Sequence, residues 1–335
     1  MQVNIENIKA AIKTGSAHLR KQLLSGHYGL ACLGKDGKPK FSNEKGHLFS
    51  TFHIVNALKG EMNEIERTIF LTRLLSEEYK DQWGYSPRGY YKDTGDNPFF
   101  VDADDTSFAL RTFRALDVYR SNDILLKYET VFDHGNKEIP AFVTFISEPE
   151  IKKIATQPNF ANNLQIHPEV NANLYHCLLD SNNDYLINEE LIALSQGADG
   201  SWHSYFYPDK HYSTFLFMSL LHQTKTLGER YSKGMNYVLS AQNENGSWGV
   251  SDGDAYLSAL ALKTLCLDKN LSDNVMRGLA YLLATINDEG YWKTNQMIWN
   301  FHDHDGDIWM AYDSNDVIAT SLCVEVFKQC LEIIK

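Results

Sequence analysis

Three aspartates, Asp102, Asp104 and Asp105, lie within a stretch of four residues. Carboxylates this close repel each other, by about 1 kcal/mol per pair in water and several times more when partly buried. The repulsion is relieved when one carboxyl group keeps its proton at neutral pH. A neutral carboxylic acid that faces an apolar space can protonate a carbon–carbon double bond. A helix dipole favours the charged form, so burial and repulsion must outweigh it for this chemistry.

Each aspartate also has an ordinary structural explanation. Asp is a preferred N-cap residue, and a carboxylate at a helix N-terminus is stabilised by backbone N–H groups. An apolar pattern with helical spacing follows over Ser107–Val118 and predicts a helix that begins near Thr106. One cap needs one aspartate, so three in four residues favour chemistry over capping alone.

The elements that must position these aspartates read as helices. Proline is scarce, with eight residues in the chain, and strand-like alternation is rare. Apolar residues recur at helical spacing in further segments, which predicts an all-α fold. These segments are Ile5–Leu24, Leu48–Leu58, Ile65–Leu75, Val170–Leu179, Tyr212–Leu221, Tyr231–Leu239, Tyr256–Leu267, Val275–Ala284 and Val317–Ile334.

An internal repeat sharpens the fold prediction. Gly stands two residues before Trp202, Trp248 and Trp292, each time after a helical stretch, and Trp83 is a candidate for an earlier copy. The spacing of about 45 residues fits a hairpin of two helices with a turn and a loop. A chain of 335 residues holds six or seven such hairpins. Closed in a ring they form an α/α barrel, and open they form a solenoid that binds other proteins.

Composition excludes several functions. A net charge of −12 argues against a nucleic-acid partner. No apolar run reaches the roughly 18 residues of a transmembrane segment, and the N-terminus lacks an apolar signal-peptide core. The five cysteines are scattered, so we expect free thiols and a cytoplasmic location. Aromatic residues make up 12% of the chain, which is enough to line a pocket.

The segment Asp102–Thr106, followed by its apolar helix, resembles the DxDD acid motif of class II terpene cyclases such as squalene–hopene cyclases and copalyl diphosphate synthases. The segments Gln196–Trp202 and Gln242–Trp248 are similar to the QW repeats of the same superfamily, and Asp96–Val101 resembles the lead-in of the hopene cyclases. The resemblance covers about residues 83–335, while residues 1–80 carry no matching motif. It implies one α/α barrel over residues 1–335, of the type called the β domain in these cyclases.

The resemblance implies roles for the residues around the acid motif. Asp104 would be the proton donor, with Asp102 and Asp105 holding and polarising it. Asn173 stands where the hopene cyclases have a histidine that hydrogen-bonds the acid. This departure affects how the acid would be oriented and reprotonated.

Aromatic residues would bind the substrate and stabilise carbocations. Each aromatic face contributes roughly 0.5–2 kcal/mol to a nearby cation. Ordinary core packing is the alternative explanation at each position. The candidates are Tyr91, Phe206, Tyr212, Trp309 and Tyr312.

A segment late in the chain alternates His and Asp. In an extended conformation His302 and His304 would lie on one side and the aspartates on the other. A solvated turn between helices is the competing explanation. If the segment binds a metal, the histidines favour Zn²⁺, whereas oxygen ligands from Asp303, Asp305 and Asp307 favour Mg²⁺. Such a site would hold a substrate diphosphate through Mg²⁺.

The leading hypothesis is a class II terpene cyclase, an enzyme that protonates the terminal alkene or epoxide of a linear isoprenoid. The resemblance to lone-barrel cyclases such as the drimenyl diphosphate synthases implies a prenyl diphosphate substrate, such as farnesyl diphosphate, in preference to squalene. Full-length relatives place the active site between two helical domains. The pocket here would therefore be closed by residues 1–80, by a homodimer partner or by a separate protein.

Two alternatives remain at this stage. A carbohydrate-active α/α barrel would place paired carboxylates on either side of a sugar. A non-catalytic member of the QW-repeat superfamily would bind an isoprenoid or a protein without turnover. Incubation with isoprenoid substrates separates the three hypotheses.

Overall fold

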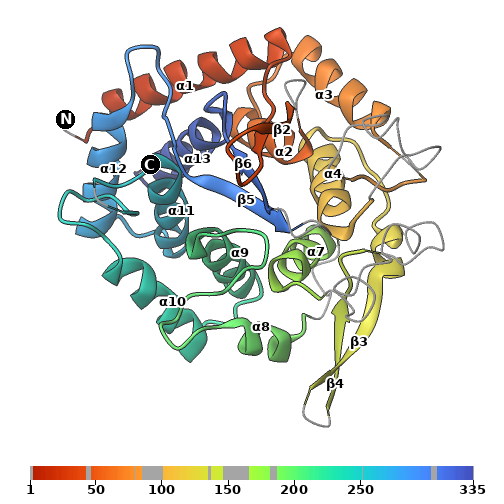
Figure 1. Cartoon of the computed structure of the whole chain (residues 1–335). Coiled ribbons are helices and arrows are strands. Elements are labelled where there is room, and N and C mark those ends of the chain that lie inside the picture. Colours follow the sequence, from red (N-terminus) through yellow and green to blue (C-terminus); the bar gives the residue numbers. More distant parts are fainter. Residues whose placement is uncertain are drawn as a thin grey trace.

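The computed structural model describes residues 3–42, 47–78, 80–84, 101–134, 137–145, 166–181, 187–250, 252–302 and 308–334. Its helices form two concentric layers around a central axis (Figure 1). Within these residues, no helix combines the length and the apolar character that crossing a bilayer requires.

The inner layer is a closed ring in which each helix packs against the next, and the last helix packs against the first. The ring is an α/α barrel of six inner helices within the described ranges, so the open solenoid is excluded. These helices are buried on most sides because neighbouring inner helices and the outer layer cover them. They are α2 (Leu48–Leu58), α4 (Ala103–Ala115), α7 (Pro168–Ser181), α9 (Lys210–Gln223), α11 (Ala255–Leu265) and α13 (Val317–Ile334).

The outer layer consists of amphipathic elements that cover the ring. In α10, for example, Tyr231, Gly234 and Val238 are buried while much of the opposite side is exposed. Helix α1 packs against α13 and α2, and α10 packs against α9 and α11. The elements are α1 (Ile5–Ser25), α3 (Glu64–Ser76), α8 (Glu189–Ser195), α10 (Glu229–Ser240), α12 (Asp273–Thr285) and the 3₁₀ helix η2 (Asp123–Tyr128), whereas the 3₁₀ helix η3 (Cys266–Asp268) continues the inner helix α11.

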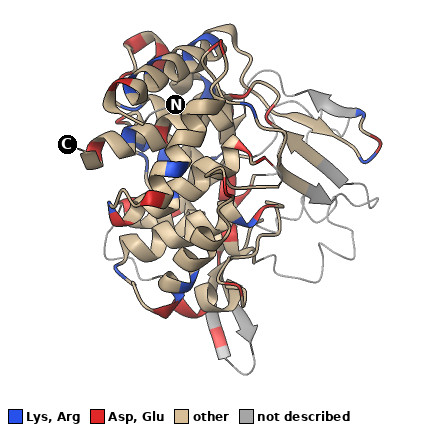
Figure 2. Cartoon of the chain, turned by 90° about the vertical axis from the view of Figure 1, so that its left-hand side faces the viewer, with Lys and Arg blue, Asp and Glu red and all other residues tan. Residues whose placement is uncertain are grey.

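Short strands interrupt the predicted all-helical pattern without changing the barrel. An antiparallel sheet in the order β2-β1-β6-β5 lies across one end of the ring (Figures 1 and 2). Strand β1 of the N-terminal part pairs with β6 near the C-terminus. The strands are β1 (Ala31–Leu33), β2 (Pro39–Ser42), β5 (Met297–His302) and β6 (Ile308–Tyr312), with a separate hairpin of β3 (Glu129–His134) and β4 (Lys137–Phe142).

The four tryptophans of the repeat, Trp83, Trp202, Trp248 and Trp292, make the same two contacts. Each indole N–H donates to a carbonyl of the preceding outer helix, at 2.7–3.1 Å; the acceptors are Leu74, Ile192, Val238 and Leu282. Each backbone N–H donates to a hydroxyl near the start of the following inner helix; the acceptors are Thr106, Thr214, Ser258 and Thr320. Trp83 makes both contacts, so it is a fourth copy of the repeat. Its hydroxyl acceptor is Thr106, which also belongs to the acid motif.

The same repeat closes the ring. The Trp202 indole lies on Gly234 of the following outer helix, and the Trp292 indole lies on Gly15 of α1. A Cβ atom added at Gly15 would lie 3.0 Å from Cζ3 of Trp292 and 2.6 Å from Cγ2 of Val324. Only glycine permits this approach, so the last repeat packs directly against the first helix.

The long connections gather at one end of the barrel. Each inner helix follows an outer element, so the inner helices begin at the same end. The connections that lead into them hold the sheet and the tryptophan loops, whereas those at the other end, such as residues 59–63 and 224–228, are short. Long loops above a rigid scaffold are the usual place for a functional site.

Candidate active site

The acid motif lies at this end of the barrel, at the start of α4. The helix begins at Ala103, three residues earlier than predicted, because Asp102 is its N-cap. The Asp102 carboxyl accepts the backbone N–H of Asp105 at 2.7 Å. The Asp102 N–H donates to the carbonyl of Trp83 at 3.1 Å, which ties the motif to the repeat. Asp104 therefore sits within the first helical turn.

Burial raises the pKa of all three carboxyl groups. Asp102 and Asp105 are buried and hydrogen-bonded to each other, and desolvation raises the pKa of Asp105 to about 6. Asp104 keeps a partly exposed surface, yet desolvation of its carboxyl group, followed by the charge of Asp105, raises its pKa well above the usual value. Desolvation and repulsion thus outweigh the helix dipole, which is the condition that a general acid requires.

Two side chains contact the two oxygens of Asp104. The Nδ2 atom of Asn173 on α7 donates to Oδ1 at 2.7 Å. The hydroxyl of Tyr207 lies 3.5 Å from Oδ2, at the outer limit of a hydrogen bond. Each oxygen of Asp104 thus faces a hydrogen-bond donor, one from α7 and one from the loop before α9.

Aromatic rings gather beside the acid. The rings of Tyr207 and Tyr212 lie 4.0 Å apart, and Phe49 lies 5.9 and 5.7 Å from them. Phe108, one helical turn after the acid, lies 5.4 Å from Phe49 and 4.9 Å from Phe52. We call these five residues the aromatic cluster. It is drawn from α2, α4, α9 and the loop before α9.

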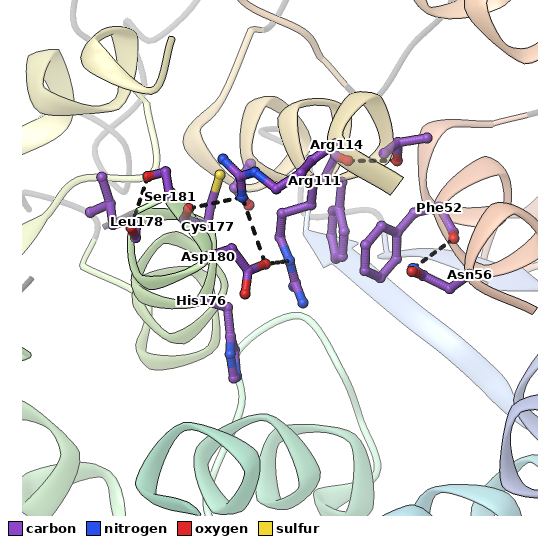
Figure 3. A network of polar contacts seen from close by, with 12 residues as sticks. Phe52, Asn56, Arg111, Arg114, His176, Cys177, Leu178, Asp180 and Ser181 are labelled. Carbon is purple, nitrogen blue, oxygen red and sulfur yellow. Dashed lines mark hydrogen bonds and ion pairs between the residues drawn. The ribbon is translucent and has the colours of Figure 1, made fainter. Parts of the chain in front are cut away.

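The inner face of α4 presents an acid, an apolar ring and a cation in successive turns. The Arg111 guanidinium lies 4.9 Å from the centre of the Phe52 ring. Its Nε atom lies 3.3 Å from a carboxyl oxygen of Asp180 on α7, and Arg114 donates to the carbonyl of Cys177 (Figure 3). The aromatic cluster thus lies between Asp104 and a cation that already has a carboxylate partner.

The predicted site residues fall into separate groups. Asp104, Asn173 and Tyr212 come together around the acid. Phe206 is half-buried and packs edge-on against the His167 ring, at 4.7 Å. Tyr312 is partly exposed in β6.

Other predicted residues lie outside what the structure describes. They are Tyr91, the side chain of Trp309, and the metal candidates Asp303, Asp305 and Asp307. The last three follow β5 in the chain, so they connect two strands and not two helices as expected. Among the described side chains, no group of three or more His, Cys, Asp or Glu is placed to hold a metal ion. A magnesium site remains a prediction.

Several neighbours of the acid were absent from the prediction. Phe108 could have been found, because it follows Asp104 by four residues and so shares its helix face. Tyr207 lies in an irregular loop. Phe49 and Phe52 belong to the part of the chain without a matching motif, so only the closed ring reveals them.

No family model and no curated protein sequence matches the chain. Solved structures do match it. The type II terpene cyclase MstE from Scytonema is 16% identical, with a TM-score of 0.72 over 99% of this chain and 100% of that one. Its complex with the substrate geranylgeranyl dihydroxybenzoate gives a TM-score of 0.71 over 98% of both chains. The chain has the fold of the type II terpene cyclases.

This cyclase fold extends to other proteins. The ent-copalyl diphosphate synthase from Streptomyces platensis is 18% identical, with a TM-score of 0.59 over 84% of this chain and 50% of that one. The protein geranylgeranyltransferase-I from Candida albicans is 13% identical, with a TM-score of 0.58 over 95% and 90% of the two chains. Because a transferase shares the fold, the reaction must be argued from the site.

Proposed function

We propose that this protein is a class II terpene cyclase in which Asp104 protonates a linear isoprenoid. The observation that supports it most is the carboxyl group of Asp104, with its raised pKa, held by Asn173 beside the aromatic cluster. An alkene is a very weak base. Its protonation needs a neutral acid in surroundings where water does not compete for the proton.

The reaction begins when the O–H bond of the neutral Asp104 carboxyl group breaks. The electron pair of the terminal double bond forms a new C–H bond and leaves a tertiary carbocation. The next double bond attacks this cation and closes a ring, and the positive charge moves along the chain. Aromatic faces of the cluster stabilise it by roughly 0.5–2 kcal/mol each. Loss of a proton from carbon, or capture of water, ends the reaction.

Asp105 acts on the acid through its charge, and Asp102 acts through Asp105, to which it is hydrogen-bonded at the start of α4. When Asp104 has given up its proton, a new carboxylate stands beside that of Asp105. Repulsion then favours uptake of a proton by Asp104, which resets the site. Holding and polarising the acid is thus divided between Asn173, which contacts it, and the two aspartates, which shape its proton affinity.

Within this class we favour a prenyl diphosphate such as farnesyl diphosphate over squalene, since one barrel offers limited room. The substrate of MstE carries a dihydroxybenzoate and not a diphosphate, so a prenylated aromatic acid is the second candidate. Mg²⁺ would be needed for a diphosphate, with Asp303, Asp305 and Asp307 as the candidate ligands. Such an enzyme would work in the cytoplasm.

Residues 1–80 supply α2 with Phe49 and Phe52, and strands β1 and β2 at the same end of the barrel. These contributions favour closure of the site by this chain over closure by a homodimer or a separate protein. The carbohydrate-active alternative is less well supported. Asp102, Asp104 and Asp105 share one turn of α4, whereas glycosidases need carboxyl groups on both sides of the sugar.

The test incubates the wild-type protein and Asp104→Asn with four substrates: farnesyl diphosphate, geranylgeranyl diphosphate, squalene and geranylgeranyl dihydroxybenzoate. Products are identified by mass spectrometry. The wild type should form a cyclic isomer or its hydrate, with one deuterium added to carbon in D₂O. Asp104→Asn should fold, as judged by circular dichroism, and form none. Turnover by Asp104→Asn, or no product from any of the four, would refute the proposal.

A further inference from the structure

Glu169 is a buried acid next to the site. It is the second residue of α7, and its side chain is 0% exposed. Its Oε1 atom accepts the backbone N–H groups of Tyr205, at 2.8 Å, and of Phe206, at 2.9 Å. Burial of a carboxylate is costly, so its retention here calls for an explanation. Its two hydrogen bonds hold the segment of residues 205–207 in place.

That segment leads directly to the acid. Tyr207 is the last of these residues, and its hydroxyl lies 3.5 Å from Oδ2 of Asp104. The Phe206 carbonyl accepts the N–H of Asn300 on β5 at 2.8 Å. The ring of His167, just before α7, stacks on Tyr205 at 4.6 Å. The start of α7 and strand β5 therefore fix the segment from two sides.

Helix α7 reaches both oxygens of the acid. Glu169 and Asn173 are four residues apart and so lie on one helix face. Asn173 contacts Oδ1 of Asp104 directly, and Glu169 reaches Oδ2 through the segment that carries Tyr207. Glu169 also acts through charge, since a second carboxylate nearby disfavours ionisation of Asp104.

We propose that Glu169 is a positioning residue that sets both the geometry and the charge around Asp104. The catalytic part of this inference rests on the proposed function, but the effect on Asp104 can be measured without a substrate. The other groups that face Asp104 are Asp105 on α4, whose charge raises its pKa, and Asn173 and Tyr207, whose hydrogen bonds lower it.

Two variants separate geometry from charge. Glu169→Gln keeps an oxygen acceptor for the two backbone N–H groups and removes the negative charge. Glu169→Leu removes both. Deprotonation of Asp104 is followed in the substrate-free protein by the infrared carboxyl band that is lost in Asp104→Asn. With the preferred substrate of the panel, kcat and KM are measured across the pH range.

In Glu169→Gln the titration midpoint of Asp104 should move down by about one pH unit. The pH above which kcat falls should move down by the same amount. Below that pH its kcat should stay within about threefold of the wild type. Glu169→Leu should lose a further 10- to 100-fold, roughly, in kcat at every pH, because Tyr207 is no longer held. If Glu169→Leu does not fold, Tyr207→Phe replaces it and should reproduce the kcat loss.

Asp313→Asn is the matched control. Asp313 is a buried carboxyl group at the same end of the barrel, where it accepts three backbone N–H groups of α13. Its replacement should leave the Asp104 midpoint unchanged. A folded Glu169→Gln with the wild-type midpoint, or a Glu169→Leu with the kcat of Glu169→Gln, would overturn the inference. Failure of the proposed function would give a different result. The wild type would then form no cyclic product, while the Asp104 titration midpoint would still shift in Glu169→Gln.

Discussion

The Nδ2 atom of Asn173 donates to Oδ1 of Asp104 at 2.7 Å, and this bond between α7 and α4 orients the carboxyl group of the acid. A carboxyl group has two nearly equivalent oxygens until a donor selects one of them as the acceptor. The amide does so without being charged itself. A histidine at the same position could also exchange protons with the acid, and asparagine cannot.

Replacement of Asn173 by leucine should reduce kcat by roughly 10- to 100-fold, since Oδ1 of Asp104 loses its donor in a buried site. Asn173→His, which can still donate, is the matched comparison and should retain more activity. Steady-state kinetics with the preferred substrate measures both. A wild-type kcat in Asn173→Leu would show that the bond is dispensable.

Activity should decline as pH rises. The donor is active only in its protonated form, and desolvation and the charge of Asp105 raise the pKa of Asp104 well above its usual value. We therefore expect kcat to be constant below that pKa and to fall about tenfold per pH unit above it. Asp105→Asn removes the second of these causes and should move the decline to lower pH. A decline at the same pH in this variant would contradict the assignment.

The Asp105 carboxyl should make the folded state less stable as pH rises from about 4 to 6. Its pKa is about 6 in the folded protein and 3.8 as the reference value, so in this window the native state holds a proton that the unfolded chain has released. Each unit of pKa difference corresponds to about 1.4 kcal/mol, so the free energy of unfolding falls by about 3 kcal/mol across this window. Asp105→Asn should abolish this fall. Urea unfolding at several pH values measures the difference, and parallel curves for wild type and variant would count against it.

A methyl group at Gly246 should destabilise the barrel more than one at Gly26. Both glycines have positive φ, 89° and 73°, so alanine is strained at either position. A Cβ atom at Gly246 would lie 2.5 Å from the carbonyl oxygen of Arg277, whereas one at Gly26 meets nothing within 4 Å. We expect a loss of about 1 kcal/mol for Gly26→Ala and several for Gly246→Ala. Thermal melting compares them, and equal losses would show that the backbone moves aside.

Loss of an aromatic ring from the cluster should change the reaction more than the fold. Phe49→Leu keeps an apolar side chain but removes a face that would stabilise a cation, so we expect kcat to fall by about 3- to 30-fold with new side products. Phe327→Leu removes an equally buried ring that packs on Trp292. The product spectrum of this control should match the wild type.

Much of the helical framework could be predicted from the sequence. The segments 48–58 and 317–334 have the same bounds in the structure, because helical periodicity is strong where a helix is buried. Helix α8 has seven residues and β1 has three, which is too short for a period to be recognised. The predicted start of α4 is three residues late because three aspartates within four residues conceal which one is the cap.

The site was only partly predictable for a different reason. Asp104 and Asn173 stand in motifs, but Glu169 acts through backbone N–H groups that any residue could supply. Phe49 joins the aromatic cluster only because α2 and α4 are neighbours in the ring. Contacts between distant parts of a chain leave no local pattern for sequence reasoning to detect.

The contact of the Trp292 indole with Gly15 has a consequence for how the molecule unfolds. A linear array of hairpins frays from its ends, since each terminal hairpin has one neighbour. Here the circle has no terminal hairpin, and every hairpin has a neighbour on both sides. Removal of a few residues around Gly15 would expose two surfaces at once, so we expect loss of the whole barrel in a single cooperative transition.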